Sequence, residues 1–469
     1  MAVIIETPDI RKDERDYILN VLLGEFLGMD WCYGPTRSRG TRVTLKGHAG
    51  EIYFPDILLS MPKASWLSHG SLPQKPLAYW DSSQLGVPIN RVDKHLPVIY
   101  GEPENGSFKQ MNSDAPGQSR VYIPIDIFGS AFFMLTRYEE VVNPDPDEHD
   151  RFRACGSLAY QEGFLERPII DEYVEVLWAA MKSLWPGLER KAFCYRLVMT
   201  HDVDRPFGVK GEPCFRVVRR FAGDLLRRKN LGMAARRAAS VMLPGPAGER
   251  LDTNNTFEKI MDQSEHLGLQ SEFYFMAGKT SDYDSGYDIF SRRLQRLLLR
   301  IHERGHVVGF HPSYGTLGRS DLLLTEAGNL RQAMERAGIR INLECGRQHF
   351  LRWKAQMTWD DWEAAGLKQD SSVGFAQHVG FRAGTCKCYQ AWSWQRRRPL
   401  KLIERPLIAM DGSLFSKKYM GLSPGLALHE LKMLADKIRP FGGDFVVLWH
   451  NDRLPDLEIS YERILREIL

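Results

Sequence analysis

Over residues 1–190, hydrophobic and polar positions follow a mixture of helical and strand-like patterns. Apolar residues recur at helical spacing in two stretches, and two others alternate as half-buried strands around a hairpin-like turn. The predicted elements are helices at 11–28 and 168–184, strands at 41–46 and 50–54, and a strand followed by a buried helix over 122–137. Few titratable residues cluster here. We therefore expect an N-terminal α/β domain at residues 1–190. Its role would be structural packing or the presentation of substrate.

From residue 191 onward, short apolar strands alternate with helical stretches. The predicted strands are Tyr195–Thr200, Ser271–Met276, Val307–Phe310, Ile341–Cys345, Leu402–Ile408 and Phe445–Trp449. The predicted helices are Phe290–Arg304, Asn329–Ala337, Trp359–Ala365 and Gly425–Ile438. Repeated β–α units over 191–469 predict an α/β fold, either a parallel barrel or a doubly wound sheet. In such folds, polar residues just after the carboxyl ends of strands carry the chemistry.

A basic segment at about 205–255 interrupts this alternation. Its basic residues are Arg216, Arg219, Arg220, Arg227, Arg228, Lys229, Arg236 and Arg237. They stand against one acid, Asp224, and interleave with apolar residues, which predicts a basic amphipathic helix or helix pair. The segment is either a solvated helix face or a surface that contacts an anionic membrane or a phosphorylated glycan carrier. Binding of nucleic acid is a weaker alternative.

Overall charge and composition narrow the class of protein. The 469 residues include 62 Lys and Arg against 59 Asp and Glu, a net charge of +3, which argues against a dedicated nucleic-acid binder. No apolar run is long enough to span a membrane, and the N-terminus lacks the pattern of a secretory signal. Seven scattered cysteines fit a reducing compartment better than a disulfide framework. We expect a cytoplasmic protein.

A pair of carboxylates leaves the first strand of the second region. Asp202 and Asp204, in the motif Thr200-His201-Asp202-Val203-Asp204, are two residues apart and point the same way from a strand. Such a pair can divide the labour of hydrolysis, one carboxylate binding a metal and the other acting as a base. An Asx turn is the structural alternative.

Four further polar motifs occur in this region, and all but the Asp370 motif adjoin predicted strands. They are Gly305–Tyr314 with His311, Gly346–Trp353 with Arg347 and His349, Asp370–Gly374 with Gly380–Thr385, and Val447–Asp452 with His450. Neutral imidazole is a common metal ligand. Together these motifs place Asp, His and Arg residues at the carboxyl ends of successive strands, the arrangement that a metal hydrolase on an α/β barrel needs.

The order of these motifs resembles that of the polysaccharide deacetylase (NodB-homology) superfamily of metal-dependent carbohydrate esterases, over about residues 191–469. The resemblance implies a distorted parallel (β/α) barrel. The whole chain also resembles a bacterial subgroup that carries an N-terminal domain of unknown role before this barrel. The stretches that resemble this subgroup are Asp126–Phe128, Arg137–Glu140 and Arg347–Leu351.

The resemblance implies a role for each motif residue. The implied roles are general base for Asp202, metal ligand for Asp204 and His311, orientation of the base for Arg347, the acid of the fourth motif for Asp370, and general acid for His450. The family's second motif has another histidine four residues after the first, where this chain has Gly315. Our candidate for the missing ligand is His349, at the third motif's proline position. The alternatives are a metal held by two protein groups and water, or no metal.

The function that this resemblance implies is removal of N-acetyl groups from a sugar or a lipid-linked glycan, with a divalent metal, zinc, as cofactor. Such chemistry would belong to bacterial surface-polysaccharide metabolism. The predicted substrate contacts are Tyr314, Phe350, Trp353, Arg382 and Trp449. Because the second histidine is missing, a non-catalytic glycan- or carrier-binding protein on a degenerate barrel is one alternative. A hydrolase of another C–N amide bond is a second.

One geometric prediction follows for Asp202 and His450, which are almost 250 residues apart. Each directly follows a predicted strand, and in a closed barrel the first and last strands are neighbours. A general base and a general acid must both reach the reacting centre. We therefore expect the two side chains to face one pocket, within roughly 10 Å of each other.

Overall fold

The structure, a computed structural model, describes residues 2–35, 39–87, 89, 92–102, 119–208, 231–243, 245–456 and 460–469. The chain forms two compact units. The first unit contains residues 1–196, 351–408 and 433–445, and the second contains 197–350, 409–432 and 446–469. The sequence places its boundary near residue 190, whereas in the structure two later segments group with the N-terminal residues.

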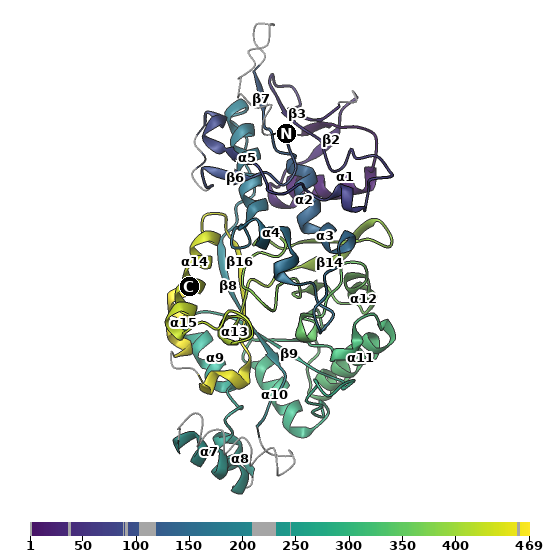
Figure 1. The fold of residues 1–469 in the computed structure, drawn as a ribbon. Helices are drawn as coiled ribbons and strands as arrows, with labels where there is room; N and C mark the ends of the chain where they lie inside the picture. The colour runs from purple at the N-terminus through teal and green to yellow at the C-terminus, as the bar shows by residue number, and fades with distance from the viewer. Residues whose placement is uncertain are drawn as a thin grey trace. The chain divides into compact units, whose positions relative to one another are not determined.

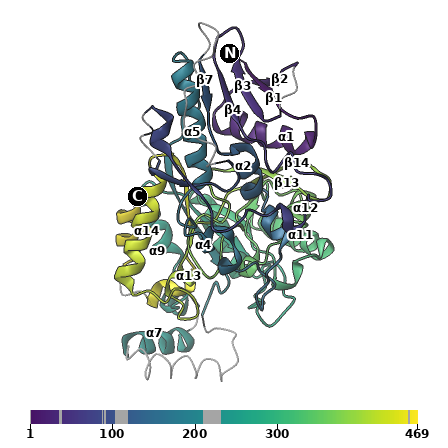
Figure 2. The same cartoon turned by 45° about the horizontal axis from the view of Figure 1, so that its top comes forward.

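The N-terminal part of the first unit is a five-stranded sheet covered by helices. The strand order is β2-β1-β3-β4-β7, with β1 parallel to β2, β4 parallel to β7, and β3 antiparallel to both of its neighbours. The strands are β1 (Val3–Glu6), β2 (Trp31–Tyr33), β3 (Thr41–Leu45), β4 (Glu51–Phe54) and β7 (Arg120–Tyr122). The helices are α1 (Lys12–Leu19), α2 (Ile127–Leu135), α3 (Tyr138–Val142), α4 (Leu158–Gln161) and α5 (Ile169–Leu184). In Figure 2, α1, α2 and α5 lie beside this sheet.

The α2 helix shows why this unit is stable. All nine of its residues are buried, and the Asp126 side chain caps its first turn by accepting a hydrogen bond from the Gly129 N–H at 2.8 Å. The helix contacts α1 and α5, so an element that is apolar all round lies in the centre of the unit. The buried helix predicted from residues 122–137 is confirmed.

Later segments complete the first unit. They contribute α12 (Thr358–Ala364), β12 (Gln369–Asp370), β13 (Tyr389–Ser393) and β14 (Arg398–Glu404), and the strand order is β13-β14-β12. Earlier in the chain, β5 (Tyr79–Asp81) and β6 (His95–Pro97) form a separate antiparallel pair. The pairing of β13 with β14 is antiparallel. The strand predicted at Leu402–Ile408 lies earlier in the sequence, at Arg398–Glu404. There it pairs with β13, the strand that precedes it in the chain.

A buried ionic cluster joins distant segments of this unit. Glu140 accepts hydrogen bonds from Arg382 at 2.9 and 2.6 Å and from Arg137 at 2.8 Å. Burial alone would raise the pKa of Glu140, but the charges of Arg382 and Arg137 lower it below its ordinary value. The ionised carboxylate therefore holds two buried guanidinium groups.

Replacing Glu140 with glutamine should destabilise the first unit by about 3–5 kcal/mol, because two buried guanidinium groups lose their charge partner. Because the pKa of the folded carboxyl is lowered, its stabilising effect is present above the ordinary Glu pKa and is lost as the pH falls through the lowered value. Urea unfolding followed by tryptophan fluorescence measures the change. The control is Glu189→Gln, at an exposed position, and equal effects of the two substitutions would contradict the assignment.

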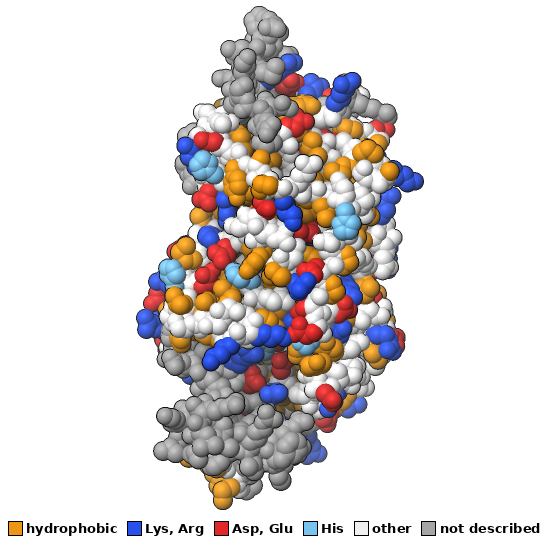
Figure 3. Space-filling view, viewed as in Figure 1, with side chains coloured by type: hydrophobic (Ala, Val, Ile, Leu, Met, Phe, Trp, Pro, Cys, Tyr) orange, Lys and Arg blue, Asp and Glu red, His pale blue; other side chains and the backbone are white. Residues whose placement is uncertain are grey.

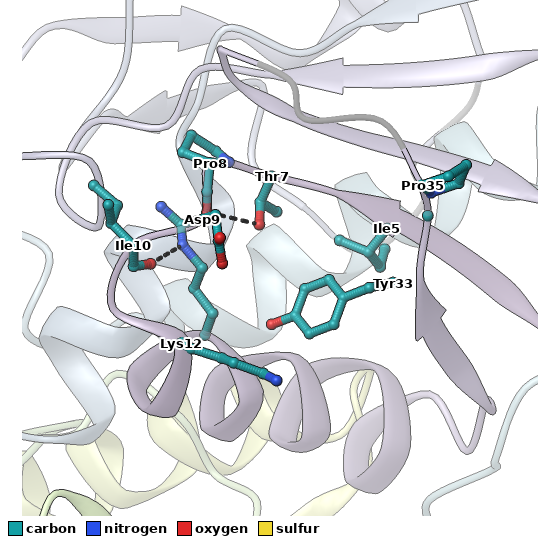
Figure 4. A pocket seen from close by; sticks show the side chains of 10 residues that line it. Ile5, Thr7, Pro8, Asp9, Ile10, Lys12, Tyr33 and Pro35 are labelled. Carbon is teal, nitrogen blue, oxygen red and sulfur yellow. Dashed lines mark hydrogen bonds between the residues drawn. The ribbon is translucent and has the colours of Figure 1, made fainter.

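A cavity of about 230 Å³ opens at the carboxyl ends of the parallel strands β1 and β2, beside the start of α1. Its lining includes Thr7, Lys12, Arg15 and Tyr33, and Figure 4 shows the Tyr33 ring beside it. The Arg15 guanidinium is held by Asp56 at 2.7 Å and by the Ile10 carbonyl at 2.8 Å. None of the residues predicted for the active site lines this cavity.

The second unit contains a mostly parallel sheet, in the order β11-β10-β9-β8-β16-β15. The strands are β8 (Tyr195–Val203), β9 (Ser271–Phe275), β10 (Val307–Phe310), β11 (Cys345–Gly346), β15 (Ala409–Met410) and β16 (Gly443–Leu448). The helices are α7 (Leu231–Met242), α8 (Gly245–Leu251), α9 (Phe257–His266), α10 (Arg292–Glu303), α11 (Ser320–Arg336), α13 (Asp411–Phe415), α14 (Pro424–Ile438) and α15 (Tyr461–Ile468). Every residue of β9 and β16 is buried, as expected where helices cover both faces of a parallel sheet. Figure 1 shows β8 and β9 side by side.

The α/β class predicted for this region is confirmed, but the described residues do not show a closed barrel. β8 lies inside the series, between β9 and β16, and β15 ends it. The first and last predicted strands are nevertheless neighbours, because the Trp449 N–H donates to the Thr200 carbonyl at 2.9 Å. Strand order, and not closure of a barrel, therefore brings the ends of β8 and β16 together.

Six of the eight basic residues of the predicted insertion lie in 209–230, outside the described residues, which resume at Leu231, the start of α7. No helix in the described part of the chain is long and apolar enough to cross a membrane. Figure 3 shows Lys and Arg side chains among Asp and Glu side chains on the visible face.

Candidate metal centre

The end of β8 presents two carboxylates on one side of the strand. Asp202 lies in β8 and Asp204 directly follows the strand, and both carboxylates approach Nε2 of His311. His201, next to Asp202 in the strand, is directed to the opposite side. His201 is fully buried, and its Nδ1 lies 2.7 Å from the Trp449 carbonyl oxygen. Burial lowers the pKa of His201 to about 4, so this histidine is a neutral core side chain.

Three residues of the second unit form a group that could hold a metal ion. Asp204, His311 and His349 each offer one ligand atom, and these atoms all lie within 4.8 Å of one another. Asp204 Oδ1 is 3.4 Å from Nε2 of His311 and 3.4 Å from Nε2 of His349. His311 follows β10 and His349 follows β11, the two strands next to β9 on the side away from β8. The structure thus brings together the three residues predicted from the sequence as ligands.

Both imidazoles are oriented through their other ring nitrogen. His311 Nδ1 lies 2.7 Å from the Arg347 carbonyl oxygen, and His349 Nδ1 lies 3.0 Å from Asp284 Oδ1. A proton on each Nδ1 leaves the lone pair on Nε2, the atom that faces Asp204. This second layer of contacts is typical of histidines that bind metals.

Two atoms of the group are buried and make no hydrogen bond within the described residues: Asp204 Oδ1 and His311 Nε2. Burial raises the pKa of Asp204, but the charges of the neighbouring histidines, His349 first, lower it well below its ordinary value. Burial alone would lower the pKa of His311. The carboxylates of Asp202 and Asp204 outweigh this effect, so the pKa of His311 is raised above its ordinary value. An ionised carboxylate beside two imidazoles, with Nε2 of His311 buried and without a hydrogen-bond partner among the described residues, fits a divalent ion, and the donor set matches the three protein ligands of catalytic zinc sites.

Asp202 lies beside this group in a buried ion pair. Arg347 Nη1 donates to Asp202 Oδ1 and to Thr200 Oγ1, both at 2.9 Å, and the Arg347 side chain is fully buried. Asp202 Oδ2 lies 3.8 Å from His311 Nε2. Because Arg347 also supplies the carbonyl that orients His311, one residue positions both a carboxylate and a predicted ligand.

His450 approaches the same group from the end of β16. Its Nε2 lies 3.8 Å from Asp204 Oδ2, and its Nδ1 lies 2.7 Å from Asp411 Oδ1. Asp411 Oδ2 also accepts the His450 backbone N–H at 3.0 Å. Burial lowers the pKa of His450, but the charges and contact of Asp411 and the charge of Asp204 raise it to about 9. Asp202 and His450 therefore both border the Asp204 group.

Position 315, where the resemblance predicted from the sequence would place a second histidine, is crowded in the structure. A Cβ on Gly315 would lie 2.7 Å from Thr280 Oγ1, which accepts the Gly315 N–H at 2.6 Å. Thr280 in turn contacts Asp284 and Ser313. A side chain at 315 would therefore displace Thr280 or this loop.

Three partly exposed aromatic rings stand next to His349. Tyr283 and Tyr314 have ring centroids 4.5 Å apart, and Phe350 lies 5.3 Å from Tyr283 and 4.7 Å from the His349 ring. Tyr314 and Phe350 are predicted substrate contacts, and the sequence analysis missed Tyr283. The Tyr283 side chain is 55% exposed, which leaves the cluster open to solvent.

Other predicted site residues have different surroundings. Trp449 is fully buried against Phe415 and Tyr461, which argues for packing and not for the predicted sugar contact. In the first unit, Trp353 is 1% exposed and packs on Trp359. These indoles offer no face to a sugar.

Two predicted polar residues are also buried within the first unit. Arg382 binds Glu140 and the Gly374 carbonyl, so its charge is neutralised there. Asp370 accepts a hydrogen bond from the Ser372 hydroxyl, and burial together with the charge of Asp370 raises the pKa of Glu404. Their contacts are those of structural residues, in place of the predicted substrate and catalytic contacts. The carboxylate that contacts His450 is Asp411 and not the predicted Asp370.

Two functional candidates of the second unit were missed from the sequence, Asp411 and Asp284. Asp411 follows the two-residue strand β15, in the stretch Leu407–Met410, and this short apolar run before an acid was the available signal. Asp284 belongs to a loop after β9, and its sequence context gives no signal of contact with His349.

Comparison with known proteins gives limited matches. Residues 3–186, less than half of the chain, match a family model described as a family of unknown function, DUF7033. No curated protein matches the chain. Among solved structures, a protein from Mycobacterium smegmatis, provisionally described as a polysaccharide deacetylase, aligns over 59% of this chain and 83% of its own, with a TM-score of 0.38 and 14% identity.

Proposed function

We propose that the chain is a metal-dependent hydrolase that removes N-acetyl groups from a sugar or from a lipid-linked glycan. The observation that supports this most is one constellation in the second unit. There, a three-residue metal group lies beside an ion-paired carboxylate, Asp202, and a carboxylate-bound histidine, His450. A metal group, a base and an acid are the parts that hydrolysis of an amide needs.

Asp202 is suited to the role of base. A bound divalent ion, held by Asp204, His311 and His349, would polarise the acetyl carbonyl and lower the pKa of a water molecule. The Asp202 carboxylate accepts the proton of the attacking water. Its ion pair with Arg347 keeps one oxygen fixed, so that the other, Oδ2, faces the metal group.

His450 is suited to the role of acid. Its Nδ1–H donates to Asp411, which fixes the ring and favours the imidazolium, and Nε2 faces the metal group from the side of Asp204. From this atom a proton passes to the leaving amine nitrogen when the C–N bond breaks. A pure glycan-binding protein has no need of this acid–base arrangement, which favours the hydrolase over that alternative.

The aromatic rings next to His349 indicate the substrate class. Tyr283, Tyr314 and Phe350 form a partly exposed apolar cluster, and pyranose rings have apolar faces that pack on such surfaces. A sugar ring placed on the cluster would carry its acetamido group toward the metal group. A cytoplasmic location and membrane contact through the basic segment stay predictions.

Acetate release tests the proposal. Full-length protein stripped of metal and then supplied with zinc is incubated with a panel of N-acetylated monosaccharides, oligosaccharides and lipid-linked glycans. We expect acetate from at least one sugar substrate, only with metal present. Sugar binding without acetate release from any substrate would contradict the hydrolase and support a binding protein.

A further inference from the structure

Asp284 is a buried carboxylate that contacts the predicted metal ligand His349 but is not itself one of the three predicted ligands. It is 3% exposed and lies in the loop after β9. We propose that Asp284 is a positioning residue that orients His349 for metal binding and ties this ligand to the Tyr314 loop. The inference rests on the proposed function and names the residue that makes a histidine after β11 usable as a ligand.

The contact with His349 fixes which nitrogen can bind the metal. Asp284 Oδ1 lies 3.0 Å from Nδ1 of His349, so Nδ1 carries the proton and Nε2 keeps its lone pair. Nε2 lies 3.4 Å from Asp204 Oδ1. His311 is oriented by a neutral carbonyl, whereas His349 is oriented by a carboxylate, which makes the imidazole a stronger donor to a metal.

The Asp284 carboxylate is itself held in place by its own loop. Its Oδ2 accepts the backbone N–H groups of Thr280 at 2.9 Å and of Ser281 at 2.8 Å, and both hydroxyls donate to the same oxygen. These contacts leave Oδ1 directed at His349. The orientation of the histidine therefore depends on a carboxylate that the loop has already fixed.

The same oxygen reaches the loop that follows His311. Asp284 Oδ1 accepts the Tyr314 N–H at 2.8 Å, and Thr280 Oγ1 contacts Ser313 and Gly315. Tyr314 belongs to the aromatic cluster next to His349. One side chain thus sets the position of a metal ligand relative to the proposed sugar platform.

Zinc affinity measures this role without any substrate. Full-length protein competes with a chromophoric chelator for zinc, and Asp284→Asn should weaken zinc binding about 10–100-fold. The matched control is Asp282→Asn, an exposed carboxylate two residues away. Its zinc affinity should equal that of the wild type.

A double-mutant cycle separates positioning from a general effect on the fold. In the His349→Ala background, Asp284→Asn should change zinc affinity by less than about twofold, because the ligand through which it acts is gone. An equal loss in both backgrounds, or no loss in the wild-type background, would overturn the proposal. If Asp284→Asn does not fold, Asp284→Glu serves as the second variant, with the same expectations.

The outcomes also separate this inference from the proposed function. If the wild type binds zinc but releases no acetate, the proposed activity fails, and the role of Asp284 is still decided by zinc affinity. If the wild type is active and Asp284→Asn binds zinc normally, only the positioning role fails.

Discussion

Replacing Asp204 with alanine should abolish metal binding and reduce kcat/KM for deacetylation by at least about 10³-fold. The substitution removes the only carboxylate of the metal group and leaves two imidazoles that approach each other without an anion between them. Metal ions contribute several kcal/mol of transition-state stabilisation, and each 1.4 kcal/mol corresponds to about tenfold in rate. Elemental analysis and acetate release measure the two effects.

The control for this substitution is Asp282→Ala, which removes an exposed carboxylate from the same unit. It should retain about one metal ion per chain and full activity. Equal metal content in Asp204→Ala and the wild type would contradict the assignment of this ligand.

Replacing His450 with alanine should reduce deacetylation of an amide about 10²–10⁴-fold, the usual contribution of a general acid. The loss should depend on the leaving group. An activated aryl acetate releases a phenolate that needs no proton, so its hydrolysis should fall less than about tenfold. Comparing kcat/KM for an N-acetylated sugar and an aryl acetate in the same variant measures the difference.

Two further variants complete this test. Asp202→Asn removes the base and should reduce hydrolysis of both substrates, whereas His429→Ala, at an exposed histidine, should change neither. If His450→Ala lost both activities equally, His450 would not be the proton donor to the leaving group. The Asp411→Asn variant should show the same leaving-group dependence as His450→Ala, with a smaller loss.

The parts of the site at the ends of clear apolar runs could be predicted from the sequence. Asp202 lies at the end of β8, and His311 and His450 follow the apolar runs that form β10 and β16. Polar residues at such strand ends lie together. The neighbouring positions of β8 and β16 were also predicted, but for the wrong reason. Strand order places them together, and the described residues do not show a closed barrel.

Residues that act through tertiary contacts could not be predicted in the same way. Asp411 follows a strand of two residues, too short for a periodic signal, and Asp284 reaches His349 across 65 positions of the sequence. Trp449 illustrates the opposite error. An aromatic residue beside a catalytic motif suggested a sugar contact, but burial against Phe415 and Tyr461 makes it part of the core.

The limits of the two units were equally hidden from local patterns. Residues 351–408 begin two positions after the predicted ligand His349, and yet they group with the N-terminal segment. The contact of Glu140 with Arg382, 242 positions apart, is one of the interactions that draw them there. A local pattern of apolar residues carries no information about such a pairing.

We infer that Asp204, His311 and His349 form one metal centre, and anomalous diffraction from crystals grown with zinc would locate the ion. We predict a single strong peak at the zinc edge, about 2.0–2.2 Å from an Asp204 carboxylate oxygen and from Nε2 of both histidines. A peak bound through other residues, or no peak at this group in crystals of zinc-loaded protein, would contradict the account.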